Sequence, residues 1–197
     1  MILTPPLSEK RVRSLELGET VFLTGIVYTG RDEMHARALE YLEEGRQLPV
    51  DIKRSALFHC GPLVRKEDER WRVVAAGPTT SARMNSLEPL FIGAYRPGAI
   101  LGKGGMSKQT VEAMRRFGCI YLAITGGAAA LAAQGVKRVV SVHWLDLGIP
   151  EALWVLEVEE FGPLTVAIDA HGNSLYERVE EETRSRLSEI GRKLGVD

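Results

Sequence analysis

The sequence has few of the features that would tie it to a metal, a membrane or a nucleic acid. It contains only two cysteines, Cys60 and Cys119, far apart along the chain, whereas an iron–sulfur cluster normally takes three or four thiolates. No apolar run is long enough to cross a bilayer, and the N-terminal stretch MILTPPLSEKRVRSL lacks a signal-peptide core. The 25 Lys and Arg residues nearly balance the 26 Asp and Glu residues, which excludes a basic nucleic-acid footprint. We therefore expect a cytoplasmic protein with reduced thiols that binds no metal by itself, no nucleic acid and no membrane.

The remaining composition is that of a globular domain. The 197 residues are 45% hydrophobic and 26% charged, enough to bury a substantial core. Extended and amphipathic segments are mixed without strict alternation and without an internal repeat, so we predict a single α/β domain over residues 1–197, with a mixed sheet and flanking helices. The predicted strands are 15–30, 55–60, 71–76 (after a charged turn at 65–70), 99–101, 119–125, 136–147, 153–160 and 164–169, and the predicted helices are 32–44, 81–92, 108–117, 126–135 and 174–194.

Three polar loops follow hydrophobic runs and carry most of the candidate chemistry. They contain the segments GRDEMH (30–35), GPTTSARM (77–84) and GKGGM (102–106). Together they supply two guanidinium groups, an ammonium group, three hydroxyls and several glycine amides, which are groups that bind carboxylates. The loops therefore predict a site for a small dicarboxylate.

The segment Thr79–Arg83 has two interpretations. If a helix begins near Ser81, its free amides and the fork of Arg83 would face an anion. Threonine and serine are equally favoured at this position as N-caps, for reasons unrelated to a ligand. The residues alone leave both interpretations open.

The other two loops also have a structural alternative. Arg31 lies at the start of a predicted helix, where a cation is unfavourable unless an anion is shared with it. Asp32 and His35 could form a local hydrogen-bonded pair that stiffens this loop. Lys103 lies in a glycine loop that matches neither a Walker A motif nor GxGxxG, and such a lysine is often only solvated. We expect His143 to be a packed or edge residue and His171 to belong to a turn.

These loops belong to a set of segments that resembles a known family. The segments are GRDEMHARA (30–38), FHCGPLV (58–64), AAGPTTSARMN (75–85), AILGKGGM (99–106), AITGGAAAL (123–131) and VEEFGPLTVAIDAHGNSLYE (158–177). In this order they resemble the β subunit, equivalently the C-terminal domain, of the class I (iron–sulfur) fumarase and L-tartrate dehydratase family. The resemblance implies a swivelling β/β/α fold.

The resemblance also implies roles for eight residues. Two take part in the reaction, four bind the substrate, and two position the binding residues without contacting the substrate. The catalytic residues are Thr79, for proton transfer, and Lys103; the substrate-binding residues are Arg31, Thr80, Ser81 and Arg83; the supporting residues are Asp32 and His35.

What the chain lacks agrees with the implied architecture. In this family the α subunit holds a 4Fe–4S cluster, so the resemblance implies a cluster-bearing partner, a higher hetero-oligomer, and hydration of fumarate to L-malate. L-tartrate dehydration stays open, because a further donor or acceptor near Thr80 or Asn85 could decide the substrate. The interpretation of the chain as a non-catalytic anion-binding module also stays open.

Overall fold

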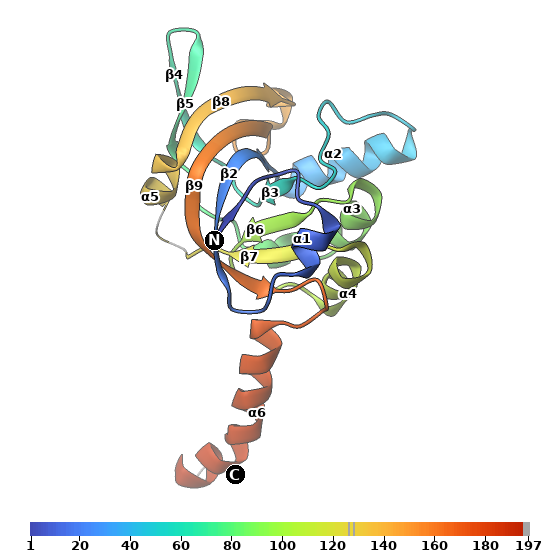
Figure 1. The fold of residues 1–197 in the computed structure, drawn as a ribbon, viewed down its shortest axis with the longest axis vertical. Helices are drawn as coiled ribbons and strands as arrows, with labels where there is room; N and C mark the ends of the chain where they lie inside the picture. The colour runs from blue at the N-terminus through green and yellow to red at the C-terminus, as the bar shows by residue number, and fades with distance from the viewer. Residues whose placement is uncertain (126, 128, 195–197) are drawn as a thin grey trace.

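The computed structural model describes residues 1–125, 127 and 129–194, which form a mixed sheet flanked by helices (Figure 1). The strand order of the seven-stranded sheet is β1-β2-β3-β6-β7-β9-β8, and β4 and β5 form a separate hairpin that projects from the body. The strands are β1 (Ile2–Leu3), β2 (Thr20–Thr29), β3 (Ala56–Phe58), β4 (Leu63–Glu67), β5 (Arg70–Ala75), β6 (Ala99–Gly102), β7 (Ile120–Ala123), β8 (Val136–His143) and β9 (Leu153–Ile168).

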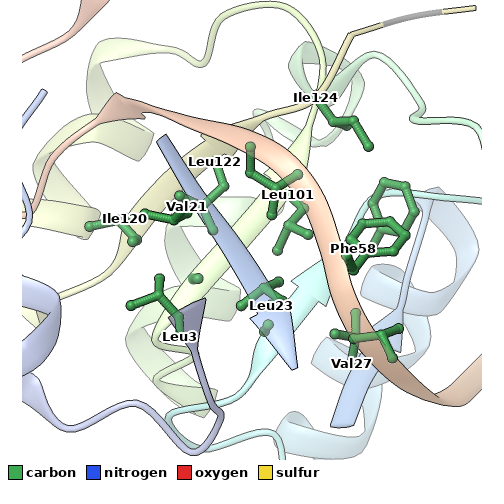
Figure 2. Packing of buried hydrophobic residues seen from close by; sticks show 14 of the residues in the cluster. Leu3, Val21, Leu23, Val27, Phe58, Leu101, Ile120, Leu122 and Ile124 are labelled. Carbon is green, nitrogen blue, oxygen red and sulfur yellow. The ribbon is translucent and has the colours of Figure 1, made fainter. Parts of the chain in front are cut away.

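The sheet closes on itself because β2 pairs with β9 as well as with β1 and β3. Strand β2 pairs in parallel with β3 and antiparallel with the long strand β9, which also pairs with β7. Strands β2, β3, β6, β7 and β9 therefore form a ring around a hydrophobic interior. Val21 and Leu23 of β2 point into this interior with Leu101 of β6 and Leu122 of β7, and all four are fully buried (Figure 2).

Helices cover one side of the parallel strands (Figure 1). Met34 of α2 and Phe91 of α3 pack on Leu57, while Met114 of α4 packs near Ile100. Helix α6 extends away from the body (Figure 1). None of the described helices is long and apolar enough to span a membrane. The helices are α1 (Glu9–Arg13), α2 (Asp32–Glu43), α3 (Glu88–Tyr95), α4 (Lys108–Phe117), α5 (Ala129–Gln134) and α6 (Leu175–Leu194), with the short 3-10 helices η1 (Ser81–Met84) and η2 (Leu145–Leu147).

The structure confirms the α/β class and corrects several predicted boundaries. The predicted helix 81–92 is divided into η1 and α3, because Pro89 has no N–H for the preceding turn and is tolerated only in the first turn of a helix. The predicted strands 153–160 and 164–169 are one strand, β9. Strand β4 occupies part of the predicted charged turn, which narrows to Asp68 and Glu69. Strand β8 ends at His143, because Trp144 is left-handed. Residues 126 and 128 of the predicted helix 126–135 lie outside the described residues.

The packed ring predicts a large penalty for a cavity at its centre. We expect Leu122→Ala to lower the free energy of unfolding by about 2–5 kcal/mol, because the side chain is fully enclosed and its removal leaves a void. Leu63→Ala is the matched control, since Leu63 on the β4–β5 hairpin is 61% exposed. Urea unfolding of both variants measures the difference; an equal effect of the two substitutions would contradict the described core.

Candidate functional site

The three polar loops meet at one edge of the sheet. Arg31 follows β2, His59 follows β3 and Lys103 follows β6, and these strands are parallel, so their carboxyl ends lie at the same edge. The backbone N–H of Thr79 donates to the His59 carbonyl at 2.6 Å, and that of Ser81 donates to the Lys103 carbonyl at 2.9 Å. The Thr79–Arg83 segment is therefore held between the ends of β3 and β6.

Three of the predicted side chains, those of Thr80, Arg83 and Lys103, are exposed and are the outward-facing groups at this edge, while Thr79 is half-buried. Thr80 occupies the N-cap position of η1, but its side chain makes no capping hydrogen bond. An N-cap function therefore does not explain the Thr80 hydroxyl, and it is accessible to a ligand.

Arg83 reaches back to Asp32. Its Nη2 lies 2.9 Å from Asp32 Oδ2 and its Nε lies 3.3 Å from Asp32 Oδ1, while half of the arginine side chain stays exposed. The local Asp32–His35 pair considered as an alternative is not formed, because His35 turns inward to other partners. Asp32 thus orients Arg83 from behind and leaves one side of the guanidinium accessible.

The anion expected beside Arg31 is Glu151. Arg31 Nη2 lies 3.1 Å from Glu151 Oε1, and the backbone N–H of Glu33 donates to Glu151 Oε2 at 3.1 Å. Gly61 is required here, because a Cβ at this position would lie 2.8 Å from Arg31 Nη1 and 2.7 Å from the Pro150 carbonyl oxygen. Glu151 is not among the residues predicted from the sequence, because its turn segment gives no local signal of this contact.

Ser81 points away from the outward-facing groups. Its side chain is fully buried, and its Oγ lies 2.9 Å from His59 Nδ1 and 2.9 Å from the Tyr121 hydroxyl. A Cβ on Gly102 would lie 1.9 Å from this oxygen, so only glycine leaves room for it. The structure therefore gives Ser81 a supporting place behind the loop, and its contact with a substrate stays a prediction.

A buried carboxylate lies below the loops between two histidines. Glu88 Oε2 is 3.2 Å from His35 Nε2 and 3.0 Å from His59 Nε2, and all three side chains are fully buried. The ring N–H directions are not aligned on the oxygen, so these contacts are ion-pair contacts rather than linear hydrogen bonds. The sequence analysis assigned His35 a supporting role but gave no role to His59 or Glu88.

Glu88, His35 and His59 together carry one negative and one positive charge. Burial alone would raise the pKa of Glu88, but the two histidines lower it to about 2. Burial lowers the pKa of His35, but Glu88 and the Arg31 carbonyl outweigh burial and raise it. Burial dominates at His59 and lowers its pKa despite Glu88. Above the lowered pKa of His59 and below the raised pKa of His35, the cluster therefore consists of a carboxylate, an imidazolium at His35 and a neutral imidazole at His59.

The same three residues are the described group that comes close enough to hold a metal ion, with ligand atoms within 4.8 Å of one another. The cysteines do not fit an iron–sulfur cluster. Cys60 and Cys119 are both buried, and burial raises the pKa of Cys60 to about 12 and raises that of Cys119 further. An iron–sulfur cluster is normally held by three or four Cys thiolates, so the two cysteines of this chain do not supply a full ligand set.

Two histidines are structural, as predicted. His143 lies half-buried on the edge strand β8, where Nε2 is 3.2 Å from Ser141 Oγ. His171 belongs to a turn in which its backbone N–H donates to Asp169 Oδ1.

Two cavities of about 710 and 750 Å³ lie away from the polar loops, the first beside Trp71 and Val136 and the second beside Leu90 and Phe117. The outward-facing groups at the loops line neither cavity.

Comparisons with known proteins agree on one family. A family model described as Fumarase C-terminus matches residues 2–179. The chain is 43% identical over 174 residues to the L(+)-tartrate dehydratase subunit beta of Escherichia coli K12, covering 88% of this chain and 85% of that protein. It is 48% identical over 185 residues to a Methanocaldococcus jannaschii protein provisionally given the same name, covering 93% and 95%. It is 38% identical over 189 residues to a Geobacillus stearothermophilus protein provisionally named fumarate hydratase class I, covering 95% of this chain and 36% of that protein.

The buried cluster predicts a pH dependence of stability. The pKa of Glu88 falls from 4.5 to about 2 on folding, so its contribution is present above pH 4.5 and is lost as the pH falls toward 2. The pKa of His35 rises above 6.5, so its contribution is present below pH 6.5 and is lost as the pH rises through the folded-state value. We expect the contribution of the pair to be largest between pH 4.5 and 6.5.

Glu88→Gln tests this prediction. We expect it to remove most of this pH dependence and to lower the free energy of unfolding by about 3–5 kcal/mol near pH 6, as breaking a buried pair does. Glu112→Gln is the control, since Glu112 pairs with Arg115 at the surface. Urea unfolding across the pH range measures both variants, and a parallel pH profile for wild type and Glu88→Gln would refute the assignment of charges.

Proposed function

Because the chain belongs to the Fumarase C-terminus family, as a β subunit of the class I fumarase and tartrate dehydratase type, we propose that it forms the charge-binding half of a hydro-lyase site. The reaction is the reversible addition of water to a dicarboxylate, with hydration of fumarate to L-malate as one candidate. Dehydration of L-tartrate is the other, and the names of the relatives at 43% and 48% identity favour it.

The observation that carries the proposal is the outward-facing set of Arg83, Thr80 and Lys103 at the carboxyl edge of the sheet. Removing a C–H proton beside a carboxylate makes that carboxylate electron-rich, and preorganised cations stabilise the developing charge. Arg83 and Lys103 provide these cations and Arg31 adds a third, shared with Glu151. Thr79 lies half-buried in the same loop and is the candidate for the proton-transfer group.

The other half of the reaction needs a partner. A hydroxide must leave or be delivered, which requires a Lewis acid or a general acid, and the buried cysteines of this chain do not fit an iron–sulfur cluster. We propose that an α subunit holds the 4Fe–4S cluster and closes the open edge. Leu145 and Ile149 are 43% and 41% exposed in the segment that leads to Glu151, so they are apolar surface that this partner would cover.

The two positions considered for substrate choice differ in their contacts. Asn85 Oδ1 accepts a hydrogen bond at 2.9 Å from the N–H of Ser107, the N-cap residue of α4. The Thr80 side chain makes no capping hydrogen bond and is exposed. Thr80 is therefore the better candidate for recognising the additional hydroxyl of tartrate.

Co-expression tests the proposal directly. The chain is produced anaerobically alone and with a candidate cluster-bearing subunit, and each preparation is assayed on fumarate and on L-tartrate. We expect turnover only when both chains are present, and a colourless, inactive protein when this chain is purified alone. Full turnover by the isolated chain would contradict the half-site proposal. No turnover of either substrate by a complex with an intact cluster would favour the non-catalytic anion-binding module.

Arg83 provides the sharpest test of the site. We expect Arg83→Ala to lower kcat/KM of the complex at least 100-fold, because the loss of a charged contact to a carboxylate costs about 3 kcal/mol or more. Arg115→Ala is the control; Arg115 is also about half exposed and also pairs with a carboxylate, that of Glu112 on α4. Steady-state kinetics of the two variants measures the difference, and near-normal activity of Arg83→Ala would refute its assignment.

A further inference from the structure

A continuous row of buried polar groups runs beneath the candidate site, and the chemistry of its ends defines the proton positions. At one end, His35 Nδ1 lies 2.7 Å from the Arg31 carbonyl oxygen. A carbonyl only accepts, so Nδ1 carries a hydrogen. His35 Nε2 faces the Glu88 carboxylate at 3.2 Å, and a bare lone pair would be repelled there, so Nε2 carries a hydrogen too. His35 is therefore an imidazolium.

The protons at the other end follow in the same way. His59 Nε2 faces the same carboxylate oxygen at 3.0 Å and carries a hydrogen. A second imidazolium would leave the buried cluster with an uncompensated positive charge, so His59 is neutral and its Nδ1 is an acceptor. The Ser81 hydroxyl therefore donates to Nδ1 at 2.9 Å, and the Tyr121 hydroxyl donates to Ser81 Oγ at 2.9 Å. Burial raises the pKa of Tyr121 and keeps it a donor.

This row contacts the backbone of each of the three polar loops. The row ends at the Arg31 carbonyl, which contacts His35 Nδ1. The N–H of Ser81 donates to the Lys103 carbonyl, and the His59 carbonyl accepts from the Thr79 N–H. The side chains of the row are all buried. The row can therefore influence the outward-facing groups only by setting the positions of their loops.

We propose that Glu88 is a positioning residue for the site: by holding His35 as an imidazolium and His59 as the Nε2–H tautomer, it fixes the backbone from which Arg31, Thr79 and Lys103 act. The inference rests on the proposed function insofar as these three residues serve a substrate. A buried carboxylate paired with one imidazolium keeps the cluster neutral. Mutation of the outer-shell groups that orient metal ligands typically changes affinity or activity 10–100-fold, and we expect an effect of this order at Glu88.

Two other charged or titratable groups act on the cluster. The charge of Asp32 on α2 acts on both histidines: it adds to the raised pKa of His35 and offsets a part of the lowered pKa of His59. Burial raises the pKa of the Cys119 thiol, beside β7, and the negative charge of Glu88 raises it further. Neither replaces Glu88, because Asp32 is paired with Arg83 and the thiol stays neutral. The one competing arrangement is a divalent metal ion held by His35, His59 and Glu88, since both Glu88 carboxylate oxygens and Nε2 of both histidines are buried without a hydrogen-bond partner among the described residues.

The first test reads the proton positions on the full chain without any assay of activity. Nitrogen-15 NMR of the histidine rings at pH 6.5–7.5 should show one buried imidazolium and one buried neutral ring protonated at Nε2, with metal analysis below stoichiometry. In Glu88→Gln the buried imidazolium signal should disappear. Two neutral buried rings in the wild type would overturn the proposal. A stoichiometric divalent metal whose removal shifts both rings would also overturn it in favour of a metal site.

The second test separates positioning from a merely structural role in the complex with the partner. We expect Glu88→Gln to lower kcat/KM at least 10-fold in the folded complex, with KM raised, whereas Glu112→Gln leaves both constants unchanged. Tyr121→Phe removes the terminal hydroxyl but keeps the packed ring, and should shift kcat/KM in the same direction by a smaller factor, even if Glu88→Gln does not fold. If the folded fractions of these variants keep wild-type kcat and KM, the role is structural and the proposal is wrong. An inactive wild-type complex with the expected NMR signals would count against the proposed function alone.

Discussion

The buried carboxylate of Glu88 is the constraint on which the arrangement of the site depends. An isolated carboxylate inside a protein is costly, and it is tolerated here because His35 and His59 both face it. The three residues come from the start of α3, the first turn of α2 and the end of β3. One electrostatic requirement therefore ties two helices to the sheet directly beneath the edge where the polar loops meet. Packing of the ring alone would hold the strands but would not set the orientation of these loops.

Much of the fold is local enough to be predicted from the sequence. The helix predicted over residues 108–117 is α4. Loops 30–35 and 102–106 lie at one edge because they follow the parallel strands β2 and β6, whereas the 77–84 loop follows the hairpin strand β5 and is held there by backbone hydrogen bonds to His59 and Lys103. The closed ring is not predictable in this way, because the pairing of β2 with β9 joins segments far apart in the chain and no local pattern encodes that partner. The break between η1 and α3 was predictable in principle, since Pro89 marks it.

The candidate site likewise contains residues that the sequence predicts and residues that only the fold reveals. Arg83 and Lys103 stand out in the sequence because charged residues in glycine- and hydroxyl-rich loops are unusual enough to notice, although their role rests on a family resemblance. Glu88, Glu151 and Tyr121 escape sequence reasoning, because an acidic residue at a helix start or a turn and a tyrosine in a strand are ordinary locally. Their importance appears only when the fold places them against His59, Arg31 and Ser81. The residues that support a site are thus harder to predict than the residues that face its ligand.

The described chain presents cations and hydroxyls on an open edge and keeps its thiols buried. We propose that one subunit holds the carboxylates of the substrate and that its partner completes the chemistry. The first measurement to make is a structure of the complex with a dicarboxylate bound. We expect carboxylate oxygens within hydrogen-bond distance of Arg83 and Lys103, above an unchanged Glu88 cluster. A dicarboxylate whose carboxylates are held entirely by the partner subunit would refute this proposal.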